Sequence, residues 1–194
     1  MKSIQNQFHH PQGLAGRIIG AVMAIENRER IEWAIQQMHI QPDDNLLEIG
    51  FGPGLGIEYA AKQAKHGFVA GVDVSIVMVK QASKRNQSAK VDLRYGSAEH
   101  IPFPDDSFSL VYAINSFHHW DDPHSAFQEI QRVLQANGRM VIVEQPPTRV
   151  TEASVINARG RTIQTALLEG GFSHVSMKSA SLSRGWTVFV EARC

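Results

Sequence analysis

The sequence predicts a single α/β domain with three layers, in which helices cover both faces of a doubly wound, mostly parallel, seven-stranded sheet. Two observations support this fold class. Short apolar runs alternate with amphipathic helical segments, which is typical of parallel strands joined by crossover helices. The last two apolar runs are separated by a short turn containing Ser183 and Gly185, and so short a connection predicts an antiparallel pair.

The expected elements follow from the spacing of apolar residues. We expect strands at residues 46–49, 68–74, 91–95, 110–115, 140–143, 175–180 and 186–192. We expect helices at residues 57–65, 76–86, 123–134 and 152–168, the last of which ends before the glycine pair 170–171. The helix at 123–134 has the clearest start, because Asp122 is a good N-cap and Pro123 suits the first helical position.

Residues 1–44 precede the expected sheet, and we expect them to form a helical cap or lid over the core at residues 45–194. Residues 5–13 are polar and contain glycine and proline, so they are expected to form a loop or an arm. Two short helices should follow, the first over residues 14–25 and the second from about Asn27. The apolar stripe of the second helix consists of Ile31, Ala34, Ile35 and Met38.

Composition excludes several classes of function. Lys and Arg total 19, as do Asp and Glu, so no net field favours nucleic acid or an anionic membrane as a partner. Cys194 is the only cysteine, which rules out an intramolecular disulfide and a cysteine-based metal cluster, and no metal site is expected. The apolar segments are too short to span a bilayer, and no signal peptide is evident. We therefore expect a cytoplasmic protein with a small-molecule substrate, while the oligomeric state stays open.

A glycine-rich loop follows the first expected strand. Residues 46–56 read LLEIGFGPGLG, with glycines at 50, 52, 54 and 56. Glycine permits a positive φ angle and a close approach of backbone to a ligand, and the amides at the start of the next helix favour a negative group. The loop would fall at the carboxyl end of a parallel strand, where open α/β sheets bind ligands.

The second expected strand ends at Asp73, which is placed to accept hydrogen bonds from the two hydroxyls of a ribose. Together with the loop, this residue indicates a nucleoside-containing cofactor. The dinucleotide pattern G-x-G-x-x-G does not fit, because Leu55 and Ile57 occupy the positions of its third glycine. A phosphate-binding P-loop does not fit either, since no Gly-Lys-Ser or Gly-Lys-Thr follows.

Further motifs follow the loop in a fixed order. They are Val72-Asp73-Val74-Ser75, Gly96-Ser97-Ala98-Glu99, Phe117-His118-His119-Trp120 and Asn137-Gly138-Arg139. In this order they resemble the class I S-adenosylmethionine-dependent methyltransferases, over about residues 45–144. The resemblance implies a Rossmann-like methyltransferase fold with an antiparallel last strand, S-adenosylmethionine as cofactor and S-adenosylhomocysteine as product.

The resemblance also assigns cofactor-binding residues. It places Glu48, Gly50, Gly52 and Gly54 around the methionine part of S-adenosylmethionine, and Asp73 at the ribose. It further places Val74 beside the adenine ring, Ser97 and Ala98 at the edge of that ring, and Ile114 and Asn115 near the methionine ammonium. Many relatives have aspartate where this chain has Ser97, so the contact with the adenine amino group is expected to be weaker or to come from Glu99.

His118 and His119 are the candidate catalytic residues. Methyl transfer requires mainly that acceptor and methyl group be held in line, and a base is needed only when the acceptor must lose a proton. Either histidine could be that base, while a structural role would explain the pair equally well. No H-E-x-x-H spacing accompanies them, which disfavours a metal site.

The sequence therefore predicts an S-adenosylmethionine-dependent methyltransferase that acts on an unidentified, small acceptor. Two alternatives stay open at this point. One is an NAD(P)-type oxidoreductase on a related fold, and the other is a non-catalytic protein that binds S-adenosylmethionine.

Overall fold

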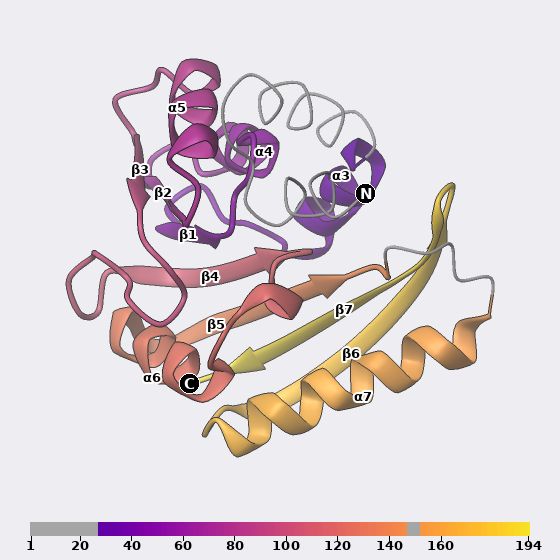
Figure 1. Ribbon diagram of the computed structural model, residues 1–194. Coiled ribbons are helices and arrows are strands. Elements are labelled where there is room, and N and C mark those ends of the chain that lie inside the picture. The colour runs from indigo at the N-terminus through magenta and orange to yellow at the C-terminus, as the bar shows by residue number, and fades with distance from the viewer. Residues whose placement is uncertain (1–26, 147–151) are drawn as a thin grey trace.

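The computed structural model describes residues 27–146 and 152–194. A seven-stranded sheet runs through this part of the chain, with the strand order β3-β2-β1-β4-β5-β7-β6 (Figure 1). The strands are β1 (Leu46–Ile49), β2 (Val69–Asp73), β3 (Val91–Tyr95), β4 (Phe108–Ile114), β5 (Leu134–Glu144), β6 (Ser173–Leu182) and β7 (Gly185–Arg193).

The first five strands are parallel, and β7 is antiparallel to both of its neighbours. β1 pairs with β2 and β4, β2 pairs with β3, and β4 pairs with β5, all in parallel. β7 lies between β5 and β6 and is antiparallel to each. The turn around Ser183 is too short for a crossover, so β6 and β7 form a hairpin. The predicted mostly parallel sheet with an antiparallel last strand is confirmed.

Helices cover both faces of the sheet and complete three layers (Figure 1). One face carries α3 (Arg28–Gln37), α4 (Leu55–Gln63) and α5 (Ile76–Arg85), and the other carries α6 (Pro123–Val133) and α7 (Ala153–Glu169). A short 3-10 helix, η1 (Phe117–His119), follows β4. Helix α6 starts as predicted, because Asp122 accepts the backbone N–H of His124 at 3.1 Å and Pro123 occupies the first helical position.

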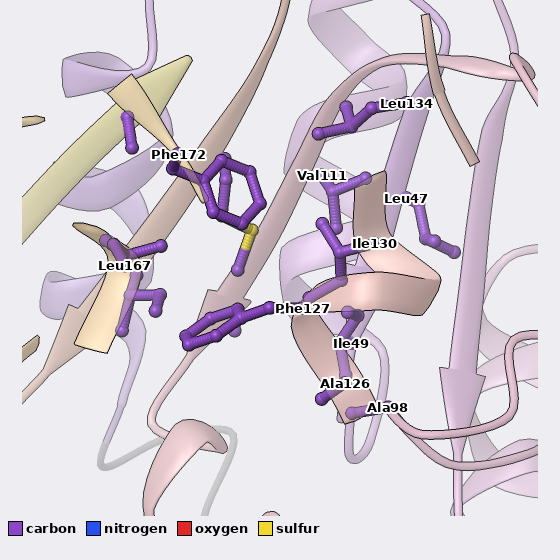
Figure 2. Close-up of a cluster of buried hydrophobic side chains, with 14 of the residues drawn as sticks. Leu47, Ile49, Ala98, Val111, Ala126, Phe127, Ile130, Leu134, Leu167 and Phe172 are labelled. Atoms are coloured by element: carbon purple, nitrogen blue, oxygen red, sulfur yellow. The ribbon is translucent and has the colours of Figure 1, made fainter. Parts of the chain in front are cut away.

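Side chains alternate along the strands between two apolar cores, one on each face of the sheet. Leu47 and Ile49 of β1 belong to the core under α6 and α7, together with Phe127 and Ile130 (Figure 2). Leu46 belongs to the opposite core, under α3, α4 and α5. Burial on both faces explains why the parallel strands read as continuous apolar runs in the sequence.

Most element boundaries lie within two residues of the prediction, whereas the start of β5 does not. Helix α4 begins at Leu55, directly after the glycine loop, rather than at residue 57. Strand β5 begins at Leu134 rather than at residue 140, because the chain leaves α6 in an extended conformation and Leu134 pairs with Phe108 before the register shifts. Residues 135–139 read QANGR and contain no apolar run, so periodicity could not reveal this part of the strand.

Only part of the expected N-terminal region can be compared with the structure. The expected arm at residues 5–13 and the expected helix at residues 14–25 lie outside the described residues. The second expected helix is α3, which follows Asn27 and packs against α4. Its Trp33 ring meets the ring of Phe189 edge-on at a centroid distance of 6.1 Å. Across residues 27–146 and 152–194, none of the helices combines the length and apolar character needed to cross a membrane.

The carboxyl ends of the parallel strands meet at one edge of the sheet. β1 and β4 are neighbours there, and the chain leaves β1 toward α4 on one face and leaves β4 toward α6 on the other (Figure 1). Such a switch point is where open α/β sheets bind ligands. Asp73, Asn115 and Glu144, which end or follow β2, β4 and β5, share this edge.

Candidate functional site

The loop between β1 and α4 owes its shape to three glycines in left-handed conformations. The φ angles are +72° at Gly50, +53° at Gly52 and +81° at Gly54. Residues with a Cβ atom rarely adopt such angles, so the alternating glycines of the sequence meet a requirement of the backbone. Gly54 is the N-cap residue of α4, and the loop therefore leads directly into the helix.

The three glycines differ in what surrounds them. A Cβ atom added at Gly50 would lie 2.4 Å from the Cβ of Ser116, and one added at Gly54 would lie 2.6 Å from the Cβ of Ala82. A Cβ atom added at Gly52 would meet no described heavy atom within 4 Å. Gly50 and Gly54 are therefore required by packing inside the fold, whereas Gly52 faces open space.

A hollow that is partly open to solvent lies over this loop. Several predicted site residues line it, namely Glu48, Gly50, Gly52, Ile114 and Asn115. Helix α3 contributes Arg30 and Ile31 to the lining, and its N-cap residue Asn27 lies there as well. The structure thus brings the predicted loop residues together with those at the end of β4, whereas the packing of Gly54 serves the turn into α4.

Glu48 lines the hollow although its side chain is almost fully buried. The hydroxyl of Tyr112 donates a hydrogen bond to its Oε2 at 3.3 Å across the β1–β4 pair. A Cβ atom at Gly56 would lie 2.4 Å from Oε1, so this glycine leaves room for the carboxyl group. Burial, opposed by the Tyr112 hydrogen bond and reinforced by the charge of Asp73, raises the pKa of Glu48 from 4.5 to about 8. The carboxyl group is therefore mostly protonated at neutral pH.

Asp73 is bonded to the glycine loop as well as to its own strand end. Its Oδ2 accepts the backbone N–H of Gly52 at 2.8 Å, and its Oδ1 accepts the N–H of Ser75 at 2.8 Å. An ionised carboxylate has about four acceptor positions, so a side chain of this type can accept more than two hydrogen bonds. Asp73 thus has a structural role that sequence reasoning missed, because it fixes the Gly52 segment relative to β2.

Large apolar side chains are exposed around the carboxyl ends of β2 and β3. Val74 is 46% exposed, Ile76 is 52% exposed and Tyr95 is 64% exposed. Tyr95 is the register partner of Asp73, so this group adjoins the residue that is predicted to bind the ribose. Exposed apolar groups at a ligand-binding edge favour a flat apolar ligand, and the resemblance gives Val74 this role toward adenine. Ile76 and Tyr95 were not predicted.

The segment after β3 carries the other residues predicted at the adenine ring. Ala98 is buried in the core under α6, so its side chain is not available to a ligand, while Ser97 is partly exposed. Glu99 accepts the backbone N–H groups of Asp121 and Asp122 at 3.0 and 3.3 Å through Oε1. Glu99 thereby fixes the chain just before α6, which explains this residue without a contact to a cofactor.

Asn115 ties the end of β4 to β5. Its φ angle is +56°, its backbone N–H donates to the carbonyl of Val143 at 2.8 Å, and its Oδ1 accepts the N–H of Gln145 at 2.8 Å. The hydroxyl of Ser116 donates to the carbonyl of Ile49 at 2.5 Å, which adds β1 to the same junction. The wall of the hollow at Asn115 is therefore held by three strand ends.

The predicted histidine segment adjoins a buried ion pair. Glu144 is fully buried at the end of β5. The Nδ1 atom of His118 lies 3.1 and 3.0 Å from its two carboxylate oxygens. Arg159 of α7 donates to Glu144 Oε2 from Nε at 3.2 Å and from Nη2 at 2.6 Å. The side chain of His118 is 31% exposed, so its ring extends from the buried carboxylate toward solvent.

These contacts determine the protonation of the Glu144–His118 pair. Burial raises the pKa of Glu144, but the hydrogen bonds and charges of His118 and Arg159 outweigh burial and hold it below the usual value. An ionised carboxylate cannot donate, so the hydrogen between the two groups belongs to His118 Nδ1. When the ring is neutral, Nε2 is then the proton acceptor. The arrangement is that of an oriented general base.

The neighbouring residues have different surroundings. The His119 ring lies beside that of His118, with the ring centroids 3.9 Å apart. Trp120 packs edge-on against Phe117 and Phe127 and belongs to the periphery of the core under α6. Within the described residues, no group of three or more His, Cys, Asp or Glu side chains is arranged to hold a metal ion.

Sequence reasoning missed Arg30, Arg159 and Tyr112. Arg30 carried a signal, because it lies four residues before Ala34 and eight before Met38, on the apolar stripe of the predicted helix. A charge at such a position is unusual and marks a candidate functional residue. Arg159 and Tyr112 carried no such signal, since the placement of α7 and the register of β1 and β4 bring them to their partners.

Comparison with known proteins identifies the family. Residues 47–142 match a family model described as a methyltransferase domain. An uncharacterized methyltransferase of Bacillus subtilis (strain 168), YdaC, is 30% identical over 176 residues, which are 91% of this chain and 97% of that protein. The chain belongs to the S-adenosylmethionine-dependent methyltransferases. A further relative, the 27-O-demethylrifamycin SV methyltransferase of Amycolatopsis mediterranei (strain S699), is 35% identical over 109 residues, 53% of this chain and 39% of that protein.

A solved structure agrees with the fold of this methyltransferase. The crystal structure of a methyltransferase from Aquifex aeolicus matches it with a TM-score of 0.69 at 19% identity, over 84% of this chain and 88% of that chain. The predicted Rossmann-like methyltransferase fold is confirmed, and S-adenosylmethionine is the cofactor. The comparisons support neither the NAD(P)-type oxidoreductase nor the non-catalytic alternative.

The residues of the site fit this cofactor. The backbone at Gly52 faces open space, so a ligand can lie against it. Asp73 presents a carboxylate at the end of β2, and exposed Val74 follows it directly. Bare backbone at Gly52, a carboxylate at Asp73 and apolar surface at Val74 are therefore present, as an amino acid, a ribose and an adenine would need.

Proposed function

We propose that this methyltransferase transfers the methyl group of S-adenosylmethionine to a small acceptor, and that His118 removes the proton that the acceptor loses. The observation that carries the proposal is the contact between His118 Nδ1 and the buried, ionised Glu144. It supports His118 rather than His119 as the base, a choice that the sequence left open.

In this proposal the glycine loop binds the methionine part of the cofactor. Gly52 provides bare backbone in the hollow, and Glu48, Ile114 and Asn115 surround the same space. Asp73 accepts hydrogen bonds from the ribose hydroxyls, at the loop segment that it already fixes. Charge-assisted bonds of this kind are stronger than neutral ones, so the ribose should contribute strongly to affinity.

The adenine ring would lie against the exposed apolar surface at Val74. Its edge would meet Ser97 and the backbone of Ala98, as the resemblance implies. The partial exposure of Ser97 agrees with this role. Because Glu99 binds the chain before α6, we place Ser97 rather than Glu99 at the adenine amino group.

The reaction requires one displacement and one proton transfer. When bound, S-adenosylmethionine supplies a methyl group on a positively charged sulfur, which keeps the electron pair of the broken bond. A lone pair of the acceptor forms the new bond to carbon, and the acceptor proton passes to His118 Nε2. Glu144 holds the ring through Nδ1 and stabilises the imidazolium that forms, while Arg159 keeps Glu144 ionised.

Several observations support a small acceptor. The formal net charge of the chain is zero, which gives no general attraction to a polynucleotide. Helix α3 and its N-cap residue cover one side of the hollow with Asn27, Arg30 and Ile31, so the space beside the loop is partly enclosed. This supports a cap role for the described part of residues 1–44. The relative from Amycolatopsis mediterranei is named for a small-molecule acceptor.

Cofactor binding and transfer can be tested separately. S-adenosylhomocysteine should raise the thermal midpoint of the protein, whereas NAD should not. Incubation with methyl-labelled S-adenosylmethionine and a fractionated metabolite extract should then label a small molecule. Label that appears only in protein or nucleic acid would contradict a small acceptor, and binding without any transfer would favour the non-catalytic alternative.

The role of His118 is tested with the acceptor identified in this way. H118Q should lower kcat by about 100-fold or more, as expected for loss of a general base, and should leave the affinity for S-adenosylhomocysteine unchanged. E144Q should also lower kcat, because the amide that replaces the carboxylate no longer favours the required tautomer. H124Q provides a control at an exposed histidine of α6. Full activity of H118Q with loss in H119Q would overturn the assignment.

A further inference from the structure

Arg30 of α3 presents a buried guanidinium group to the hollow. The residue is only 7% exposed, and it lines the hollow together with Gly50 and Asn115. Its Nη2 donates to the Oδ1 of Asn27 at 2.8 Å. Within the described part of the chain, Nε and Nη1 have no hydrogen-bond partner. Buried donors are nearly always paired, so these two nitrogens indicate that a ligand group belongs beside them.

The position of Arg30 is set by the contacts of its helix. Glu29 accepts the backbone N–H of Ser183 at 3.0 Å, which ties the start of α3 to the turn between β6 and β7. Glu32 accepts the hydroxyl of Tyr59 at 2.7 Å, which ties the middle of α3 to α4. The guanidinium is therefore held at the hollow by the fold rather than by a charged partner of its own.

The charges around Arg30 favour an anion. Burial lowers the pKa of Arg30 to about 10, an effect partly offset by the charge of Glu144, so the group is still protonated at neutral pH. Glu144 is already hydrogen-bonded to His118 and Arg159. Glu48 also lines the hollow, but its carboxyl group is mostly neutral at that pH. A carboxylate that enters the hollow would meet a cation that lacks a hydrogen-bonded anion among the described residues.

We propose that Arg30 binds the carboxylate of the methionine part of S-adenosylmethionine. The inference rests on the proposed placement of that part against Gly50 and Gly52, which line the same hollow as Arg30. An acidic acceptor would offer the same carboxylate chemistry. Ligands that differ only in the carboxylate of the cofactor distinguish these two sources.

The test is a binding cycle measured by calorimetry. The ligands are S-adenosylhomocysteine, its neutral carboxamide, and 5′-methylthioadenosine, which has no amino acid part. R30M should weaken the binding of S-adenosylhomocysteine by about 10- to 100-fold, the range expected for the loss of charged hydrogen bonds. It should change the binding of the other two ligands less than about 2-fold. R28M, on the exposed side of the same helix, should leave the affinities for all three unchanged.

Folding of the variant is checked by thermal unfolding without ligand. R30M should melt at the wild-type temperature or above it, because an apolar side chain replaces a buried cation with two unpaired donors. If R30M does not fold, R30Q keeps the polar side chain and provides the same comparison. Equal losses for all three ligands would mean that Arg30 acts only through the fold, and no loss for any ligand would assign it to the acceptor. Either result overturns the proposal, whereas a wild type that binds none of the ligands would contradict the proposed function itself.

Discussion

The buried carboxyl group of Glu48 should make the stability of the ligand-free protein fall as the pH rises. Its pKa is about 8 in the folded protein, against an ordinary value of 4.5. Between these values the folded protein keeps a proton that the unfolded chain releases, so a higher pH favours unfolding. Glutamine has nearly the shape of the protonated side chain and does not ionise. E48Q should therefore remove this contribution.

The expected size follows from the two pKa values. Each unit of difference between the folded and unfolded states corresponds to about 1.4 kcal/mol, so the whole difference corresponds to roughly 5 kcal/mol. Between about pH 5 and about pH 8, the free energy of unfolding should fall by roughly 3 to 4 kcal/mol of this total. Domains of this size are stable by about 5 to 15 kcal/mol, so the change is a large part of the total.

Urea denaturation at a series of pH values measures the effect. E48Q should match the wild type near pH 5 and should exceed its free energy of unfolding by roughly 3 to 4 kcal/mol near pH 8. Glu58 supplies a control, because the hydrogen bond from Lys62 holds its pKa below 4.5. E58Q should therefore shift stability by a constant amount above about pH 5.

The result that refutes the reasoning is a constant difference between wild type and E48Q over the whole range. It would show that Glu48 is already ionised at pH 5 in the folded protein. Burial beside Tyr112 would then not control the protonation of this group, and the neutral state assigned to Glu48 at neutral pH would be wrong. The free energy of unfolding should fall with urea concentration at the same slope in both proteins. Equal slopes show that both expose the same amount of surface on unfolding.

Two further substitutions test the placement of the cofactor. D73A should weaken the binding of S-adenosylhomocysteine by about 1 to 3 kcal/mol. It should also lower the thermal midpoint, because the amides of Gly52 and Ser75 lose their acceptor. An unchanged affinity in calorimetry would leave Asp73 a purely structural role. G52V should abolish binding in a folded protein, since its side chain fills the open space of the loop, and normal binding would place the methionine part elsewhere. G54A should mainly lower the thermal midpoint, because its Cβ would meet Ala82 at 2.6 Å.

The fold could be predicted from the sequence where one local pattern determines an element. The strands buried on both faces read as apolar runs, and Asp122 with Pro123 marked the start of α6. The turn at Ser183 is too short for any connection except a hairpin. The early start of β5 at Leu134 escaped prediction, because pairing with Phe108 rather than local composition makes that segment a strand.

The site was predictable to the same extent. Gly52 and Asp73 could be selected as candidates because each meets a demand that shows in the sequence, namely backbone freedom in a loop and an acid at a strand end. The contacts around the candidate base could not be predicted. The contact between His118 and Glu144 joins residues 26 positions apart. Arg159 belongs to α7, which follows β5 in the sequence. Contacts of this kind depend on register and helix placement, which composition does not encode.

Arg30 and Glu48 are the residues at which the sequence pattern and the burial conflict. One is a cation on the apolar stripe of α3, the other is an acid within a buried strand, and both line the same hollow. In the ligand-free protein the acid holds its proton and the cation lacks partners for two nitrogens among the described residues. The methionine part of S-adenosylmethionine carries an ammonium and a carboxylate, which complement the two groups. Local inconsistency of this kind lowers the stability of the fold and is expected where a ligand supplies the missing interactions.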